Sequence, residues 1–165
     1  MNKLFCDIDS TLNNHWERIQ RCTINGKCDF SKAFSKEEIM KDKVLDGALE
    51  SLDKLSLFYE IHFLTARPFD NAYEITKEWL DKNGFKYESI IVVKSPMDKI
   101  QHLIKSDCLF IDDLSRRHEI YPPYKILYWN VIRELNRNNI KYEIFKNNWL
   151  ELEQKYCILD PPIGK

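Results

Sequence analysis

The sequence predicts an α/β fold: a Rossmann-like parallel sheet of about five strands, flanked by helices. Short apolar runs alternate with amphipathic segments along the chain, and strands separated by helices of about 10–15 residues are typical of βαβ units. The chain of 165 residues is 44% hydrophobic and 31% charged, which is the composition of a globular protein with a core of its own. Together these observations favour one domain with a small insert.

Three strands are predicted in the first part of the chain: Lys3–Cys6, Glu60–Leu64 and Ser89–Val93. Leucines recur at spacings of three and four residues between Val44 and Leu57, which predicts a helix with one apolar face. A second helix is predicted over Asn71–Asn83 and ends at Gly84, because glycine readily adopts the left-handed conformation that closes a helix.

In the second part, Ser95 and Pro96 provide an N-cap and a first-turn proline for a helix over Met97–Lys105. The apolar runs Cys108–Ile111 and Lys125–Trp129 are predicted to be the fourth and fifth strands, and Asn148–Tyr156 a closing helix. Pro161 and Pro162 then end regular structure.

The segment Asn13–Lys43 interrupts this alternation and is too long for a plain loop. We therefore expect residues 1–12 and 44–165 to form the core and residues 13–43 to form a small helical cap over the strand ends. Phe30 and Phe34, four residues apart, are expected to form the core of this insert.

The formal net charge of -1 gives no global signature of binding to nucleic acid or membrane. No apolar run approaches the ~18 residues that span a bilayer, and the N-terminus does not resemble a targeting signal. The chain has five cysteines and no CxxC pair. An odd number of cysteines without that spacing favours a reducing, cytoplasmic location.

Polar residues gather where the predicted strands end. Asp7 and Asp9 follow the first strand, Thr65, Ala66 and Arg67 end the second, and Asp112 and Asp113 end the fourth; Lys94 ends the third, and Lys99 begins the helix after it. Ligands bind beyond the carboxyl ends of parallel strands. Carboxylates this close repel each other unless a cation holds them, and hard oxygen ligands suit Mg²⁺. The sequence therefore predicts a magnesium site at this edge.

These motifs resemble those of the haloacid-dehalogenase-like superfamily of phosphohydrolases. Its DxDxT signature is matched by Asp7 to Thr11, its second-strand hydroxyl by Thr65, its lysine by Lys99, and its acidic pair by Asp112 and Asp113. A narrower resemblance, covering nearly the whole chain through looser motifs, is to the 5'(3')-deoxyribonucleotidase branch. The residues that carry this narrower resemblance are 46–49, 126–130 and 148–151. The triplet 65–67 is also seen in lipin-like and polynucleotide-phosphatase-like branches.

The superfamily resemblance implies a catalytic role for each motif. Asp7 would be the nucleophile that forms an aspartyl-phosphate, and Asp9 would protonate the leaving oxygen and then activate water. Thr65 would donate a hydrogen bond to the phosphoryl group, and Lys99 would neutralise its charge, with Lys94 as the competitor for that role. The expected Mg²⁺ ligands are Asp7, Asp9, Asp112 and Asp113, the last of these directly or through water.

Substrate contacts are expected around this centre from Thr11, Ala66, Arg67, Trp16 and Lys94. Arg67 would reach the substrate phosphate or pair with a nearby acid, and Trp16 would stack on a nucleobase or pack the insert onto the core. Arg116 and Arg117 are expected to form a solvated face.

The predicted substrate is a small phosphomonoester, in particular a nucleoside monophosphate. The insert carries a slight excess of basic residues (Arg18, Arg21, Lys27, Lys32, Lys36, Lys41, Lys43) over acidic ones (Glu17, Asp29, Glu37, Glu38, Asp42). That balance suits one anionic monoester better than a long polyanion. Two alternatives remain open at this point: a phosphatase for nucleic-acid ends and a non-catalytic, Mg²⁺-dependent binding module.

Overall fold

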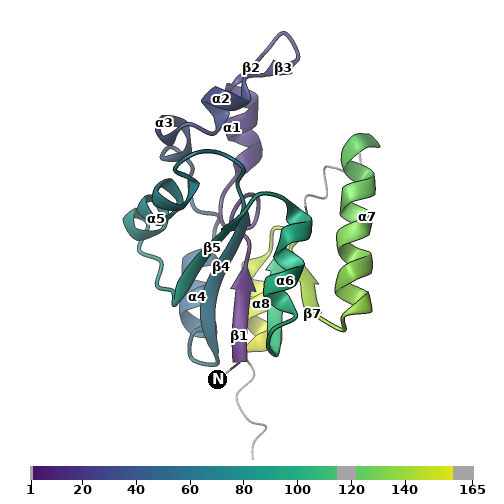
Figure 1. The fold of residues 1–165 in the computed structure, drawn as a ribbon. Coiled ribbons are helices and arrows are strands. Elements are labelled where there is room, and N and C mark those ends of the chain that lie inside the picture. The colour runs from purple at the N-terminus through teal and green to yellow at the C-terminus, as the bar shows by residue number, and fades with distance from the viewer. Residues whose placement is uncertain (1, 115–121, 158–165) are drawn as a thin grey trace, which may run out of the picture.

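A parallel sheet forms the centre of the computed structural model, which describes residues 2–114 and 122–157 (Figure 1). Its five strands lie in the order β5-β4-β1-β6-β7, and all pair in parallel. Their bounds are β1 Asn2–Cys6, β4 Tyr59–Ala66, β5 Ser89–Val93, β6 Cys108–Asp112 and β7 Lys141–Ile144. The predicted Rossmann-like α/β fold is therefore confirmed.

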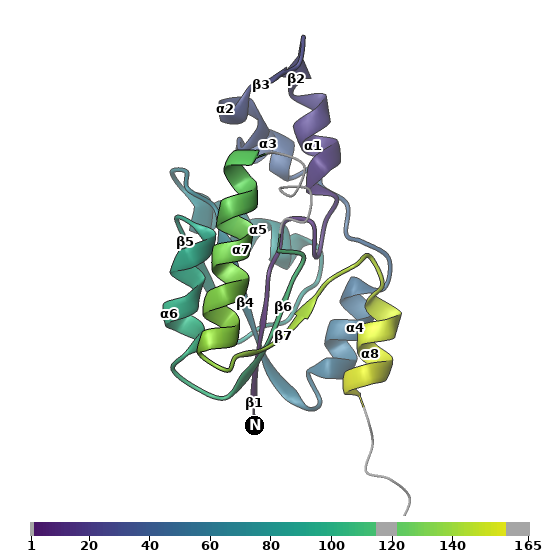
Figure 2. The same ribbon diagram turned by 90° about the vertical axis from the view of Figure 1, so that its right-hand side faces the viewer.

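Helices cover both faces of this sheet (Figure 2). Successive side chains of a strand point to opposite faces, so in β1 Leu4 and Cys6 belong to one apolar cluster and Phe5 to the other. The first cluster includes side chains of α4 (Ala48–Leu55), α5 (Ala72–Lys82) and α8 (Trp149–Tyr156). The second includes side chains of α6 (Ile100–Leu103) and α7 (Pro122–Arg137). No described helix is long and apolar enough to cross a membrane.

The prediction of a strand at Lys125–Trp129 is wrong, because these residues lie within α7. A short apolar run fits a buried strand and a buried helix equally well. Further along, Tyr128, Val131 and Leu135 are buried at helical spacing, whereas Trp129 is 52% exposed. The fifth strand is instead β7, a short edge strand whose pairing with β6 the pattern did not predict.

The insert contains three short helices and a small hairpin: α1 (His15–Arg21), β2 (Thr23–Ile24), β3 (Lys27–Cys28), α2 (Phe30–Ala33) and α3 (Lys36–Ile39). Asn25 and Gly26 both have positive φ, as a tight two-residue hairpin turn requires. In Figure 1 the insert lies beyond the end of the sheet to which β1 points.

Both ends of the insert are attached to the core. Asn13 forms isolated bridges to Asp9 and Val44, and the indole of Trp79 donates a hydrogen bond to the backbone carbonyl of Asp42 at 3.0 Å. The insert is therefore held at its base by backbone and side-chain contacts.

Candidate active site

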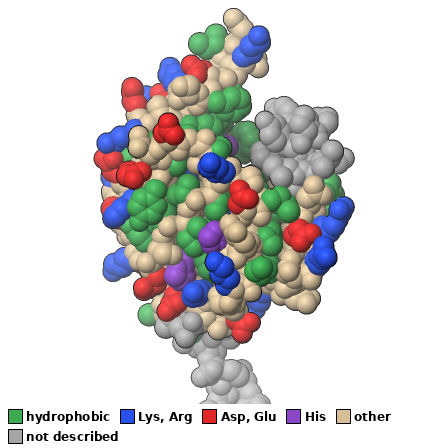
Figure 3. All heavy atoms as spheres, viewed as in Figure 1, with side chains coloured by type: hydrophobic (Ala, Val, Ile, Leu, Met, Phe, Trp, Pro, Cys, Tyr) green, Lys and Arg blue, Asp and Glu red, His purple; other side chains and the backbone are tan. Residues whose placement is uncertain are grey.

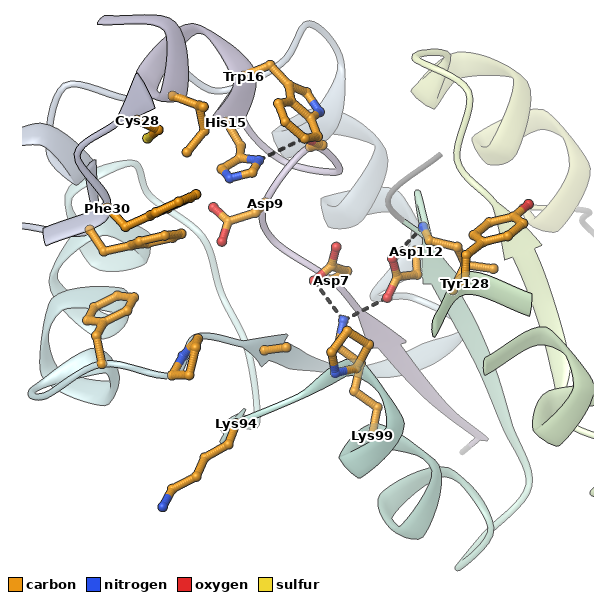
Figure 4. A pocket seen from close by; sticks show the side chains of 18 of the residues that line it. Asp7, Asp9, His15, Trp16, Cys28, Phe30, Lys94, Lys99, Asp112 and Tyr128 are labelled. Atoms are coloured by element: carbon orange, nitrogen blue, oxygen red, sulfur yellow. Dashed lines mark hydrogen bonds and ion pairs between the residues drawn. The ribbon is translucent and has the colours of Figure 1, made fainter. Parts of the chain in front are cut away.

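A cavity of about 1050 Å³ lies between the insert, the carboxyl ends of the strands and α7 (Figure 4). Asp7, Lys99 and Asp112 line it on the core side, and Trp16 and Phe30 on the insert side. A volume of this order is ample for a small-molecule ligand. On the face seen in Figure 3, described side chains of both charge signs are interspersed rather than gathered into one patch.

Three buried carboxyl groups come together at the floor of the cavity. Asp7 follows β1, Asp112 ends β6 and Asp113 comes next; one carboxylate oxygen of each lies within 4.8 Å of the others. β1 and β6 are adjacent parallel strands, so residues that follow them meet at the same edge. The structure thus brings together three of the four predicted metal ligands.

Lys99 supplies the positive charge that these acids face. Its Nζ lies 3.0 Å from Asp7 Oδ1 and 2.7 Å from Asp112 Oδ2, and the side chain is 5% exposed. Lys99 ends the 3₁₀ helix η1 (Pro96–Lys99), where Ser95 and Asp98 form a capping box that fixes the helix start.

Lys94, the competing lysine, is exposed at the end of β5. It also lines the cavity, but its ammonium group points away from the acids in Figure 4. Of the two lysines, Lys99 is therefore the one that contacts the acids.

Burial and the crowding of acids raise the pKa values of Asp7 and Asp113. Burial, and next the charge of Asp112, raise the pKa of Asp7 to about 7, although Lys99 acts in the opposite direction. Burial and the charges of Asp112 and Asp7 hold the pKa of Asp113 well above its usual range. Removing these carboxyl protons without a compensating cation is therefore costly.

Thr11 ties the two acidic loops together. Its hydroxyl accepts a hydrogen bond from the backbone N–H of Asp113 at 3.1 Å and lies 3.4 Å from Asp7 Oδ2. The residue is fully buried and is not among the described residues that line the cavity. Its contacts are those of a support for the acids, in contrast to the expected contact with substrate.

Asp9 is separated from this group and held by two arginines. Arg67 binds its carboxylate through both Nε (3.1 Å) and Nη2 (2.9 Å), and Arg18 approaches Oδ1 at 3.3 Å. Asn13 donates a further hydrogen bond at 3.2 Å. Burial opposes the charge of Asp9, but the two arginines outweigh it and hold its pKa well below the usual range.

The Asp9 carboxylate is thus not among the three converging metal-ligand groups, although sequence analysis counted it as a ligand. Arg67 pairs with this acid and with the Thr76 hydroxyl at 2.8 Å, which is one of the two alternatives left open for it.

Arg18 is a residue of the site that sequence analysis did not single out. Its side chain is fully buried, and it ion-pairs with Asp42 as well as with Asp9. Asn13 donates to the same Asp42 carboxylate at 3.0 Å. Arg18 and Asn13 therefore connect Asp9 to Asp42, and so join the first helix of the insert to both of its ends. A charged residue at a helix position where an apolar residue is expected is the sequence pattern that could have identified Arg18. The insert contains so many charged residues that this pattern cannot be recognised in it.

Thr65 and Ala66 end β4 beside the acids. Thr65 is fully buried, and within residues 2–114 and 122–157 its hydroxyl has no hydrogen-bond partner. It is not among the described lining residues, whereas Ala66 lines the cavity. A buried hydroxyl without a partner is uncommon in proteins, and the donor role expected of Thr65 stays a prediction.

Aromatic side chains form the insert side of the cavity. The rings of His15 and Trp16 lie 4.9 Å apart, and Phe34 links Phe30 (6.3 Å) to Phe69 of the core (5.2 Å). Phe30 is 57% exposed, so the expectation that it forms the insert's core is wrong. Phe69 and Tyr128 also line the cavity and were not predicted to do so.

Arg116 and Arg117, which were expected to form a solvated face, lie outside the described residues. No family model matches this chain, and a search of curated proteins found no match, so its likeness to the haloacid-dehalogenase-like superfamily is a resemblance of motifs.

Proposed function

We propose that this protein is a Mg²⁺-dependent phosphomonoester hydrolase that works through an aspartyl-phosphate on Asp7. The observation that carries the proposal is the convergence of Asp7, Asp112 and Asp113 on one another at the floor of a large cavity, with Lys99 paired to Asp7 and Asp112. Phosphoryl transfer needs positioning and charge neutralisation more than covalent chemistry, and this arrangement can provide both.

The donor set fits Mg²⁺. Three carboxylates within 4.8 Å supply hard oxygen ligands. Burial and the charges of neighbouring acids raise the pKa values of Asp7 and Asp113, and a divalent cation would favour their ionised forms. Asp7, Asp112 and Asp113 would hold the ion. When bound, it would neutralise negative charge on the phosphoryl group and keep Asp7 ionised.

In the first half-reaction, a carboxylate oxygen of Asp7 forms a bond to phosphorus while the ester P–O bond breaks. Lys99, already bonded to Asp7 Oδ1, stabilises the charge that spreads over the phosphoryl oxygens. In the second half, water attacks the phosphorus of the intermediate and phosphate leaves, which regenerates Asp7.

The resemblance assigns to Asp9 the role of the base that takes the proton from this water; its two arginines keep it ionised and also weaken it as a base. Donating a proton to the leaving oxygen in the first half requires the protonated form instead. We therefore expect esters whose leaving groups depart as stable anions, such as nitrophenyl phosphate, to react faster than alkyl phosphates.

Nucleoside monophosphates are the substrates that we propose. The aromatic side chains Trp16, Phe30 and Phe69 line the cavity that contains Asp7 and Lys99, and a base held there could stack on a ring while its phosphate reaches the acids. The resemblance to the deoxyribonucleotidase branch is consistent with this choice.

The experiment that tests the proposal is a phosphate-release screen over nucleoside monophosphates, sugar phosphates and phosphorylated oligonucleotides, with Mg²⁺ and with chelator. We expect release from nucleoside monophosphates that chelator abolishes and Mg²⁺ restores. Preference for oligonucleotides with a steep salt dependence would instead support action on nucleic-acid ends. Absence of release from every ester, with Mg²⁺ bound, would contradict the proposal and leave a binding module.

A further inference from the structure

The chain from the end of β7 to the start of α8 contacts both acidic segments, and neither Phe145 nor Trp149 is among the described residues that line the cavity. Directly after β7, the backbone N–H of Phe145 donates to the carbonyl of Asp112 at 2.9 Å. Four residues later, at the start of α8, the indole Nε1–H of Trp149 donates to the carbonyl of Thr11 at 2.8 Å. One short piece of chain therefore holds the loop after β1 and the loop after β6.

Thr11 transmits the contact with Trp149 to the acids. Its hydroxyl accepts from the Asp113 N–H at 3.1 Å and lies 3.4 Å from Asp7 Oδ2. The backbone of Thr11 is thus fixed by Trp149, and its side chain lies between Asp7 and Asp113. A shift of this backbone would change the spacing of both carboxylates.

Trp149 is itself held firmly. It is 1% exposed, its ring lies 5.2 Å from that of Phe145, and its carbonyl accepts a hydrogen bond from the Ser51 hydroxyl of α4 at 3.3 Å. Gly47 approaches it so closely that a Cβ at that position would lie 3.4 Å from Trp149 Cβ. The indole is therefore a rigid donor whose direction is set by the packing of α4 against α8.

We propose that Trp149 is a positioning residue, whose indole N–H holds the loop after β1 so that Asp7 and Asp113 converge on one ion. The expected effect on kcat rests on the proposed function, because Trp149 acts on turnover through Asp7. The expected effect on Mg²⁺ affinity does not, since that affinity depends only on how the carboxylates converge.

The chain contains a matched control for testing this role. Trp79 is also fully buried, its indole donates to a backbone carbonyl (Asp42, 3.0 Å), and its ring stacks on an aromatic neighbour, Phe85. Trp149→Phe and Trp79→Phe each remove one buried indole hydrogen bond and keep an aromatic ring. They differ in whether the lost bond leads to Asp7 and Asp113, two of the three converging acids.

The experiment measures the melting temperature, the Mg²⁺ dissociation constant and the kcat and KM for nitrophenyl phosphate of both variants. We expect similar losses of melting temperature. Trp149→Phe should weaken Mg²⁺ binding severalfold and lower kcat by about tenfold to a hundredfold with little change in KM, because small misplacements of reacting groups have effects of that size. Trp79→Phe should leave the Mg²⁺ dissociation constant unchanged, because its bond leads through Asp42 towards Asp9 and not to the three converging acids.

Equal effects of the two substitutions on Mg²⁺ binding, or none from either, would overturn the positioning role of Trp149. If the wild-type protein releases no phosphate, the proposed function fails, and the Mg²⁺ comparison still decides this inference. If Trp149→Phe does not fold, NMR of the wild-type protein replaces it. The indole resonance of Trp149 should then shift on addition of Mg²⁺ more than that of Trp79, and equal shifts would refute the inference.

Discussion

Replacing Lys99 by methionine tests how strongly the acids depend on this one cation. The substitution keeps an apolar stem of similar length and removes an ammonium group that lies 3.0 Å from Asp7 and 2.7 Å from Asp112. Removing one partner of a buried ion pair costs about 3–5 kcal/mol, because the remaining charge is left without compensation. For a chain of this size, that corresponds to a fall in melting temperature of about 6–20 °C.

The loss should depend on pH and on Mg²⁺. Lys99 lowers the pKa of Asp7, so in Lys99→Met this pKa rises above its value of about 7. A carboxyl group whose pKa is higher in the folded state than in the unfolded state stabilises the protonated fold at low pH, and this contribution is lost as pH rises through the folded pKa. The variant should therefore be least stable in alkaline buffer without Mg²⁺. Mg²⁺ should raise its melting temperature more than that of the wild type.

Thermal unfolding with and without Mg²⁺ measures these effects, and phosphate release measures the catalytic one, a fall of about 10²–10³ in kcat. Lys94→Met is the control, because it removes a lysine that lines the same cavity but is exposed. Equal melting temperatures and equal turnover of Lys99→Met and Lys94→Met would refute this role of Lys99.

Three further results are expected. Mg²⁺ binding should weaken as pH falls from about 8 to about 6, because protons compete for carboxyl groups with raised pKa values, Asp7 at about 7 among them; calorimetric titrations that show equal affinity at both pH values would contradict this. Trp16→Ala should raise KM for a nucleoside monophosphate by about one to two factors of ten, because stacking on the base is lost, and should leave KM for a small aryl phosphate unchanged. An equal rise in KM for both substrates would identify Trp16 as a packing residue. Arg18→Met should destabilise the fold by about 3–5 kcal/mol in denaturant titrations, because Asp42 loses a buried partner, whereas Arg21→Met, which breaks a half-exposed pair with Glu38, should cost less than about 1 kcal/mol; equal costs would refute the structural account of Arg18.

The sheet and most of its helices were predictable because their signals are local. β-Branched runs and leucine periodicity mark β5 and α4 within a few residues of their observed bounds. The fifth strand was not predictable in this way. The run Lys125–Trp129 has no internal feature that separates helix from strand, and β7 is a short edge strand defined by its partner β6.

The same distinction applies to the candidate site. Parallel topology brings residues that follow adjacent strands together, so the approach of Asp7 to Asp112 follows from the order of elements. The partners of Asp9 do not, because Arg18 belongs to the insert and its position depends on how α1 packs. The indole of Trp149 reaches Thr11 across 138 positions of the chain, a contact that no local pattern encodes.

The covalent state of Asp7 during turnover tests the central claim most directly. The protein is mixed with Mg²⁺ and nitrophenyl phosphate, quenched in acid within the first turnovers, and digested for mass spectrometry. We predict one added phosphoryl group on Asp7 in the wild type, together with loss of both the adduct and phosphate release in Asp7→Asn. Steady phosphate release from wild type with Asp7 unmodified, and undiminished release from Asp7→Asn, would contradict the account.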